Sequence, residues 1–252
     1  MTDQNIVDRI AALLAKAEST NHEAEAEAFN AKAQELMLKY AIDEAALKAS
    51  GGKTAEEPIV LVTIPVKEKL QGTRARQGLV GVIATTMNCR AYIDTGRHQM
   101  KVAGYESDAR FTQMLFMSLM LQQQRFILPA LRQARERFVP PVDRDGYCYE
   151  HGRRDHAQCL KFREGVWRRN FINAYCQRVG ARIQERYVAA TQEAGESVAI
   201  VLKGKGDRVR DWLSERVILG SAKPSRRTAY NHDAAVQGGA AGNAADISGG
   251  RN

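Results

Sequence analysis

The 252-residue sequence has no apolar run of the roughly 18 residues that a transmembrane helix needs, so we expect no membrane-spanning segment and no membrane partner. Its first residues, MTDQNIVDRI, are polar and acidic and lack the basic start and apolar stretch of a secretory signal. Together these absences predict a protein of the reducing cytoplasm. Cysteines are also few, and in that compartment we expect all four to be thiols or metal ligands rather than disulfides: Cys89, Cys148, Cys159 and Cys176.

The motifs of common catalytic sites are missing as well. There is no G-x-S-x-G nucleophile, no complete phosphate-binding Walker loop, no H-E-x-x-H and no dinucleotide fingerprint. We find neither an internal repeat nor a coiled-coil register. An apolar fraction of 44% and a charged fraction of 26% are typical of a globular protein with a packed core. The sequence therefore predicts a folded protein and identifies no reaction, which favours a function other than catalysis.

The spacing of apolar residues predicts an α+β fold in which helices dominate. An N-terminal helical hairpin is expected within residues 1–50, with helices over 4–18 and from 23 onward and a short third helix over 43–49. Thr20 and Glu23 have the spacing of a capping box that would open the second helix. The connection between the two helices is short, which favours antiparallel neighbours. A glycine-rich and acidic linker follows up to residue 57.

A larger domain is expected over 58–220, built on two long helices with a few short strands. Strands are predicted at 58–66, 89–94, 98–104 and 197–202, and helices at 70–87, from Ser107 or Asp108 onward, at 155–191 and at 207–216. Pro129 should kink or end the first long helix. That helix contains FTQMLFMSLML, which is apolar nearly all round and so predicts a buried central helix. The tail over 221–252 is rich in Ala, Gly and Arg, and we expect it to be partly disordered.

The N-terminal pattern resembles a known family. The stretches IVDRIAALLAKAEST and EAEAFNAKAQELMLKYAID, over residues of about 4–45, resemble the bacterial and phage domain of unknown function 2786. The segments GYESDARFTQMLFMSLMLQQ, WRRNFINAYCQRVGARI and GGAAGNAADI resemble the companion domain that often follows it. The resemblance implies a bacterial or phage protein, working in the cytoplasm of the host cell. It implies no established activity and transfers no catalytic residues.

Charge is distributed unevenly along the chain. The net charge is +8, but residues 1–57 hold six Lys/Arg and eleven Asp/Glu, which leaves the remainder strongly basic. A basic surface attracts polyanions, of which nucleic acid is the commonest. Arg178, Arg182 and Arg186 repeat every four residues and predict a positive ridge on one helix face. Alternatively, this basic surface is simply solvated or contacts the acidic N-terminal segment of the same chain. The predicted nucleic-acid contacts are Arg168, Arg169, Arg178, Arg182, Arg186, Lys203 and Lys205.

A cluster of cysteines and histidines predicts a possible zinc site. Cys148, His151, His156 and Cys159 have the spacing C-x2-H-x4-H-x2-C, and zinc takes four nitrogen or sulfur ligands in a tetrahedron. The alternative is a proline-rich loop in which Cys159 is only a small apolar residue. Gly204-Lys205-Gly206 lies between a predicted strand and helix, as a phosphate loop does, but lacks the rest of that signature and is better explained as a turn.

Three functions follow from these patterns. The preferred hypothesis is a non-enzymatic, nucleic-acid-associated protein that uses a basic helix face. The first alternative is a protein–protein adaptor that docks through the N-terminal helix pair. The second is a metal-dependent hydrolase or nuclease, since carboxylates and histidines can bind a divalent metal that activates water. Its groups would come from the loop over 143–159 and are Asp143, Asp145, Glu150, His151, Asp155 and His156.

Overall fold

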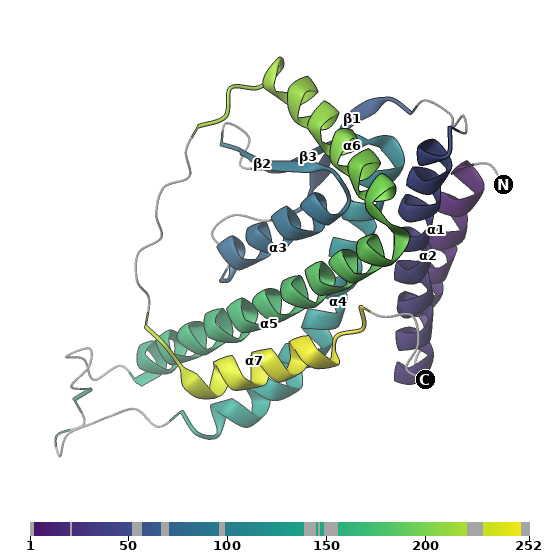
Figure 1. The fold of residues 1–252 in the computed structure, drawn as a ribbon. Helices are drawn as coiled ribbons and strands as arrows, with labels where there is room; N and C mark the ends of the chain where they lie inside the picture. The colour runs from purple at the N-terminus through teal and green to yellow at the C-terminus, as the bar shows by residue number, and fades with distance from the viewer. Residues whose placement is uncertain are drawn as a thin grey trace.

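A computed structural model describes residues 3–20, 22–51, 57–66, 71–95, 99–138, 145, 147–148, 156–220 and 229–247 (Figure 1). The described part is mainly helical and carries one small sheet, which confirms the helix-dominated α+β fold. No helix in these ranges combines the length and apolarity needed to cross a membrane. In chain order the elements are α1 (Asp3–Ser19), α2 (Glu23–Ala49), β1 (Ile59–Ile64), α3 (Thr73–Thr86), β2 (Arg90–Asp94), β3 (Gln99–Tyr105), α4 (Glu106–Arg135), α5 (His156–Ala194), α6 (Glu196–Ser214) and α7 (His232–Ala244).

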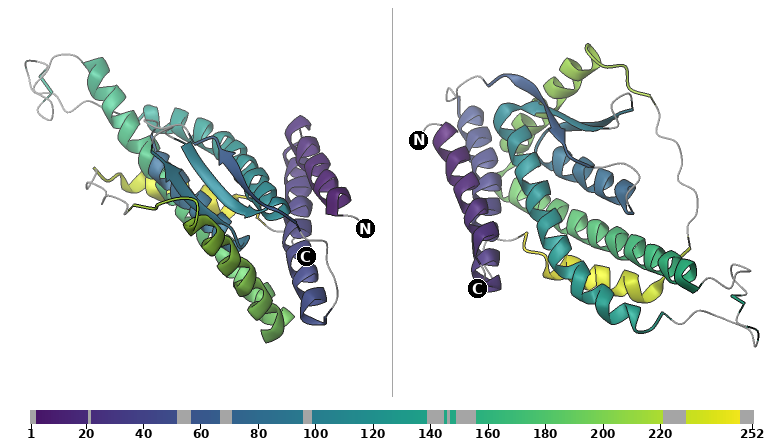
Figure 2. Two further views of the ribbon diagram at one scale, coloured as in Figure 1. Left: turned by 90° about the horizontal axis from the view of Figure 1, so that it is seen from above. Right: turned by 180° about the vertical axis from the view of Figure 1, so that it is seen from behind.

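Helices α1 and α2 form the predicted antiparallel hairpin, with Ile10 and Leu14 of α1 buried (Figure 2). The predicted short third helix is the last part of α2, which runs unbroken to Ala49. The predicted capping box has a different geometry: the Thr20 hydroxyl accepts the N–H of His22 and bonds Glu25 at 2.9 Å. The hairpin shares its core with the rest of the chain, because the Tyr40 ring packs edge-on against Phe111 of α4 at 5.9 Å between centroids.

The sheet has the antiparallel order β1-β3-β2. Strands β1 and β2 are joined by α3 and separated in space by β3, the arrangement known as a split β-α-β unit. Side chains alternate between the two faces of β3. Val102 faces the main core with α3 and α4, whereas Ala103 packs with Val209 and Leu213 of α6. The sheet therefore lies between α4 and α6 (Figure 2).

The two predicted long helices are α4 and α5. Helix α4 continues through Pro129 instead of ending there. Its apolar segment is buried on one side only, since Phe111 is fully buried while Met117 and Leu121 are 40% and 42% exposed. Helix α5 takes the central position instead and contacts α2, α3, α4, α6 and α7. The expectation of a central α4 was therefore wrong in part, because an apolar sequence does not fix how much of a helix its neighbours cover.

The C-terminal part differs most from expectation. The predicted strand over 197–202, the turn at 204–206 and the short helix at 207–216 together form one helix, α6. Its buried residues have helical spacing, which overrides the β-branched composition of its first turns. They are Val198, Leu202, Lys205, Val209 and Leu213. Residues 232–244 of the tail that we expected to be partly disordered form α7, which begins at Asn231 with its side chain accepting the N–H of Ala234. Helix α7 packs along α5 (Figure 1).

Candidate nucleic-acid interface and buried ion cluster

The predicted arginine ridge on α5 contacts the end of α7. Arg182 donates from Nη1 to the carbonyl oxygens of Gly242 and Ala245, at 2.7 and 2.6 Å. Arg186 donates to the carbonyl of Ile247, and Arg178 donates to the side-chain oxygen of Asn243. The last carbonyls of a helix carry partial negative charge, so cations are stabilising there. The three arginines do share a surface of α5, but α7 and the residues after it already accept hydrogen bonds from each of them.

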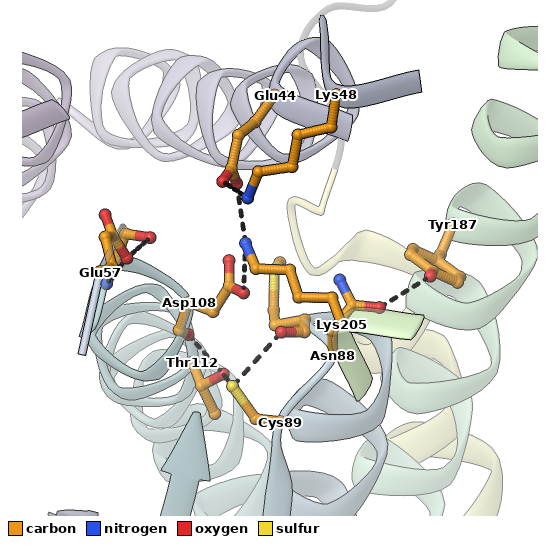
Figure 3. A network of polar contacts seen from close by, with 11 residues as sticks. Glu44, Lys48, Glu57, Asn88, Cys89, Asp108, Thr112, Tyr187 and Lys205 are labelled. Carbon is orange, nitrogen blue, oxygen red and sulfur yellow. Dashed lines mark hydrogen bonds and ion pairs between the residues drawn. The ribbon is translucent and has the colours of Figure 1, made fainter. Parts of the chain in front are cut away.

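Lys205 was predicted to contact phosphate, and the structure places it elsewhere. Its side chain is 5% exposed, and the ammonium lies 2.7 Å from Glu44 of α2 and 2.9 Å from Asp108 of α4 (Figure 3). An ammonium enclosed by two carboxylates cannot reach a nucleic acid on the surface, so this part of the prediction was wrong. Lys203, two residues earlier on α6, is exposed.

The Lys205 cluster, which we define as Glu44, Lys48, Asn88, Cys89, Asp108 and Lys205, joins three helices and the turn before β2 (Figure 3). Lys205 donates a hydrogen bond to Glu44 and forms an ion pair with Asp108. Within the described residues, neither carboxylate oxygen of Asp108 has a hydrogen-bond partner. Complete burial, with smaller contributions from Glu44 and Glu57, raises the pKa of Asp108 to about 6 against the attraction of Lys205.

The pKa values of Lys205 and Glu44 are shifted in the direction that favours an ion pair. Burial acts against it, but Asp108 and Glu44 together raise the pKa of Lys205, so it stays an ammonium. Burial likewise opposes the shift at Glu44, where Lys205 and Lys48 lower the carboxyl pKa below its ordinary value. The ammonium also lies 5.1 Å from the centre of the Tyr105 ring, a cation–π contact. The cluster therefore ties α6 to α2 and α4 through charge as well as packing.

Cys89 and Asn88 are the members of the Lys205 cluster that lie in the turn between α3 and β2. The Cys89 thiol donates to the carbonyl of Met87 at 3.3 Å and lies 3.9 Å from the Thr112 hydroxyl. Burial first, and Asp108 second, raise the pKa of this thiol well above its ordinary value, so it is protonated and a poor nucleophile. Asn88 has a left-handed φ of 55° at the end of α3, where asparagine is the usual substitute for glycine. Its side-chain oxygen accepts from Tyr187 at 3.4 Å.

A second basic surface lies where α4 ends and α5 begins, and we call it the basic tip. It holds seven Lys/Arg and three acids, Glu136, Glu164 and Asp233, for a net charge of +4. Glu164 lies 2.8 Å from both Arg135 and Arg168, so one carboxylate is shared by two guanidiniums. Although partial burial opposes it, their hydrogen bonds lower the pKa of Glu164. The basic residues of the tip are Arg132, Arg135, Arg137, Lys161, Arg163, Arg168 and Arg169.

The predicted zinc ligands are only partly described. Cys148 and Cys159 are both buried, at 0% and 1% exposure. His151 and the side chain of His156 lie outside the described residues, as do Asp143, Glu150 and Asp155 of the predicted hydrolase site; Asp145 is exposed. Within the described ranges, no group of three or more His, Cys, Asp or Glu is placed to hold a metal ion. The zinc site and the hydrolase site therefore stay predictions.

Comparison with known proteins bears on the first two helices. Residues 5–44 match the model of a family described as "Protein of unknown function (DUF2786)". The N-terminal resemblance is confirmed. No curated protein matches the chain, and no solved structure does. The matched region, which we call the DUF2786 segment, ends at Glu44, the residue that pairs with Lys205.

Sequence reasoning missed the Lys205 cluster because lysine, glutamate and aspartate are nearly always exposed. One signal for it was present. Lys205 follows Leu202 by three residues and precedes Val209 by four, which places it on the apolar stripe of a helix. Because residues 197–202 were predicted as a strand, the helical spacing that continues through Lys205 was not recognised.

Proposed function

We propose that this protein binds nucleic acid through the basic tip, and that it does so as a binding protein rather than as an enzyme. The observation that carries the proposal is the net charge of +4 on a surface formed by the end of one helix and the start of another. Arg132, Arg135, Arg137 and Lys161 are exposed there. Guanidinium and ammonium groups bind phosphate oxygens in any sequence, so we expect affinity for the backbone more than for particular bases.

The position of the basic tip supports a role toward an external partner. The acidic N-terminal helices lie at the other end of the molecule, as two opposite views agree (Figures 1 and 2). Of the residues first predicted to meet phosphate, Lys205 is the one that pairs with the DUF2786 segment. The tip is therefore not neutralised by the acidic helices, and this favours an external polyanion over an intramolecular contact.

The test compares two charge-reversed pairs in the full-length protein. The variant Arg132→Glu with Lys161→Glu changes the tip, and Arg9→Glu with Arg208→Glu makes the same change in net charge at exposed sites on α1 and α6. Affinity for labelled single- and double-stranded DNA and RNA is measured by fluorescence anisotropy at several salt concentrations. We expect the tip variant to bind about tenfold more weakly or worse, with a salt slope reduced by about 2, and the control to keep most of the affinity. Equal losses in both variants, or no binding by the wild type, would reject the proposal.

An adaptor role is the second candidate, and the arrangement of the hairpin limits where it could act. Helix α2 packs against α4, α5 and α6, so a partner would meet the outer face of α1, where Asp8, Ala12 and Lys16 are exposed. Deleting residues 1–50 would also remove Glu44 and disturb the Lys205 cluster. A cleaner test is Asp8→Arg with Lys16→Glu: an adaptor should lose its captured partner while its unfolding midpoint stays unchanged, and retained capture would argue against this role.

A further inference from the structure

Residues 229–247, which we call the C-terminal strap, lie along α5 in the same direction as that helix (Figure 1). At its start, the Trp167 indole lies 3.5 Å from Asp233. Farther on, Gly238 packs against the backbone of Phe171. At its end, Arg186 donates to the carbonyl of Ile247. The strap therefore covers about five turns of α5, from its basic start to the arginine ridge.

The strap is complementary in charge to what it covers. It contains two acids, Asp233 and Asp246, and no lysine or arginine. Its oxygen atoms contact four arginines, which are Arg137, Arg178, Arg182 and Arg186. These acceptors are one carboxylate, one amide and several main-chain carbonyls, and phosphate oxygens offer arginine the same kind of acceptor with a full negative charge.

The side chains that hold the strap against the main core are small. Its buried residues are Ala234, Gly238, Ala241, Gly242, Ala245 and Ile247, of which Ile247 is the largest. Helix α7 also contains three glycines, and glycine is the least favourable helix residue after proline. A helix of such low intrinsic propensity keeps its form only while it stays packed on α5, so it unwinds when a ligand replaces that contact.

We propose that Arg137, Arg178, Arg182 and Arg186 form a second binding site for a nucleic-acid phosphate backbone, and that the strap covers this site until the ligand displaces it. The inference rests on the proposed function, since Arg137 belongs to the basic tip and joins the covered site to it. The strap and the phosphates compete for the same guanidinium donors. A nucleic acid that enters at the tip gains three further arginines as the strap leaves.

The direct test detaches the strap by one substitution. Gly238→Leu places a side chain against the Phe171 carbonyl, where even a Cβ would lie 2.2 Å from the oxygen. Gly239→Leu is the matched control, since a Cβ at that position meets nothing within 4 Å. We expect Gly238→Leu to bind a DNA oligonucleotide about tenfold more tightly at low salt, with a salt slope steeper by about 3, because three more arginines are available. The control should bind as the wild type does.

Two outcomes of this test overturn the inference: a folded Gly238→Leu protein with wild-type affinity and slope, or a gain that persists after Arg178→Gln and Arg182→Gln are added. If Gly238→Leu does not fold, hydrogen exchange of the wild type decides. Amides of residues 234–247 should exchange faster when the oligonucleotide is bound, and unchanged or slower exchange overturns the inference. The tip variant separates the two proposals. If this variant loses binding, and if the strap of the wild type stays in place when the oligonucleotide is bound, the tip is the interface and the strap is not a cover.

Discussion

Gly238 in α7 lies directly against the main-chain carbonyl of Phe171 in α5, so close that a Cβ at this glycine would be 2.2 Å from the oxygen. Gly242, one helical turn later, has the same relationship to α5, where its Cβ would be 2.8 Å from the Cβ of Arg178. Small residues spaced by four along a helix permit this close approach of two backbones. The glycines and alanines from which we expected partial disorder are therefore what packs α7 onto α5.

The first prediction concerns this contact. Gly238→Ala should lower the free energy of unfolding by about 1–3 kcal/mol, because a rigid carbonyl must move to admit the methyl group. Gly239→Ala should instead be neutral or stabilising by up to about 1 kcal/mol, since alanine favours a helix and nothing obstructs its Cβ. Urea unfolding of both variants measures the difference. Equal stabilities would show that the two helices do not pack this closely.

The second prediction concerns the buried ammonium. Lys205→Met removes the ammonium that pairs with buried Asp108 and partly buried Glu44, and breaking a buried ion pair on one side costs about 3–5 kcal/mol. Lys203→Met on the exposed face of α6 is the control, with an expected change within about 0.5 kcal/mol. Denaturant midpoints of the two variants give the comparison. A Lys205→Met protein as stable as the control would mean that the carboxylates do not depend on this lysine.

The third prediction is a pH dependence that belongs to Asp108. Its pKa is raised to about 6 in the folded protein, above the ordinary value of an unfolded aspartate. Below that pKa the folded state binds a proton that the unfolded state does not, so this contribution to stability grows as pH falls from 7 toward 4.5 and is lost as pH rises through 6. Relative to Asp108→Asn, the wild type should gain about 2 kcal/mol over this range. A constant difference between the two proteins would contradict the raised pKa.

The fourth prediction concerns zinc at Cys148 and Cys159. Both thiols are buried, and the sequence predicts His151 and His156 as the other ligands. Gently purified protein should contain about one zinc ion per chain by mass spectrometry of the metal. Cys148→Ser with Cys159→Ser should lose it, and Cys176→Ser, a buried cysteine bonded to Gln123, should keep it. Substoichiometric zinc in the wild type would reject the site.

The sequence predicts a helix best where the helical spacing of apolar residues continues over several turns. The predicted helix over 155–191 and the structure's α5 agree closely because Trp167, Phe171, Val179 and Ile183 keep one buried face over several turns. Helix α6 was harder, since SVAIVL has the composition of a strand and only the later Leu202, Lys205 and Val209 reveal the helical period. The β propensity of this stretch favours a strand, whereas the spacing of its apolar residues favours a helix. The helix forms because it buries those residues on one face.

The candidate site was predictable only in part. The spacing of Arg178, Arg182 and Arg186 correctly predicts one surface of α5, but nothing local shows that a helix some sixty residues later covers it. Helix α7 could not be predicted from propensity, because its three glycines disfavour a helix and its stability comes from α5. The basic tip is likewise formed by two segments that the sequence separates and only the fold brings together.

The contact between Glu44 and Lys205 spans 161 residues, and this has a consequence for synthesis of the chain. At about 5–20 residues per second, roughly ten to thirty seconds pass between the emergence of these two residues from the ribosome. During that interval the DUF2786 segment lacks the helix that its last acidic residue binds. The hairpin is therefore among the last parts of the molecule to be completed, because its contact with α6 forms only after that helix has been made.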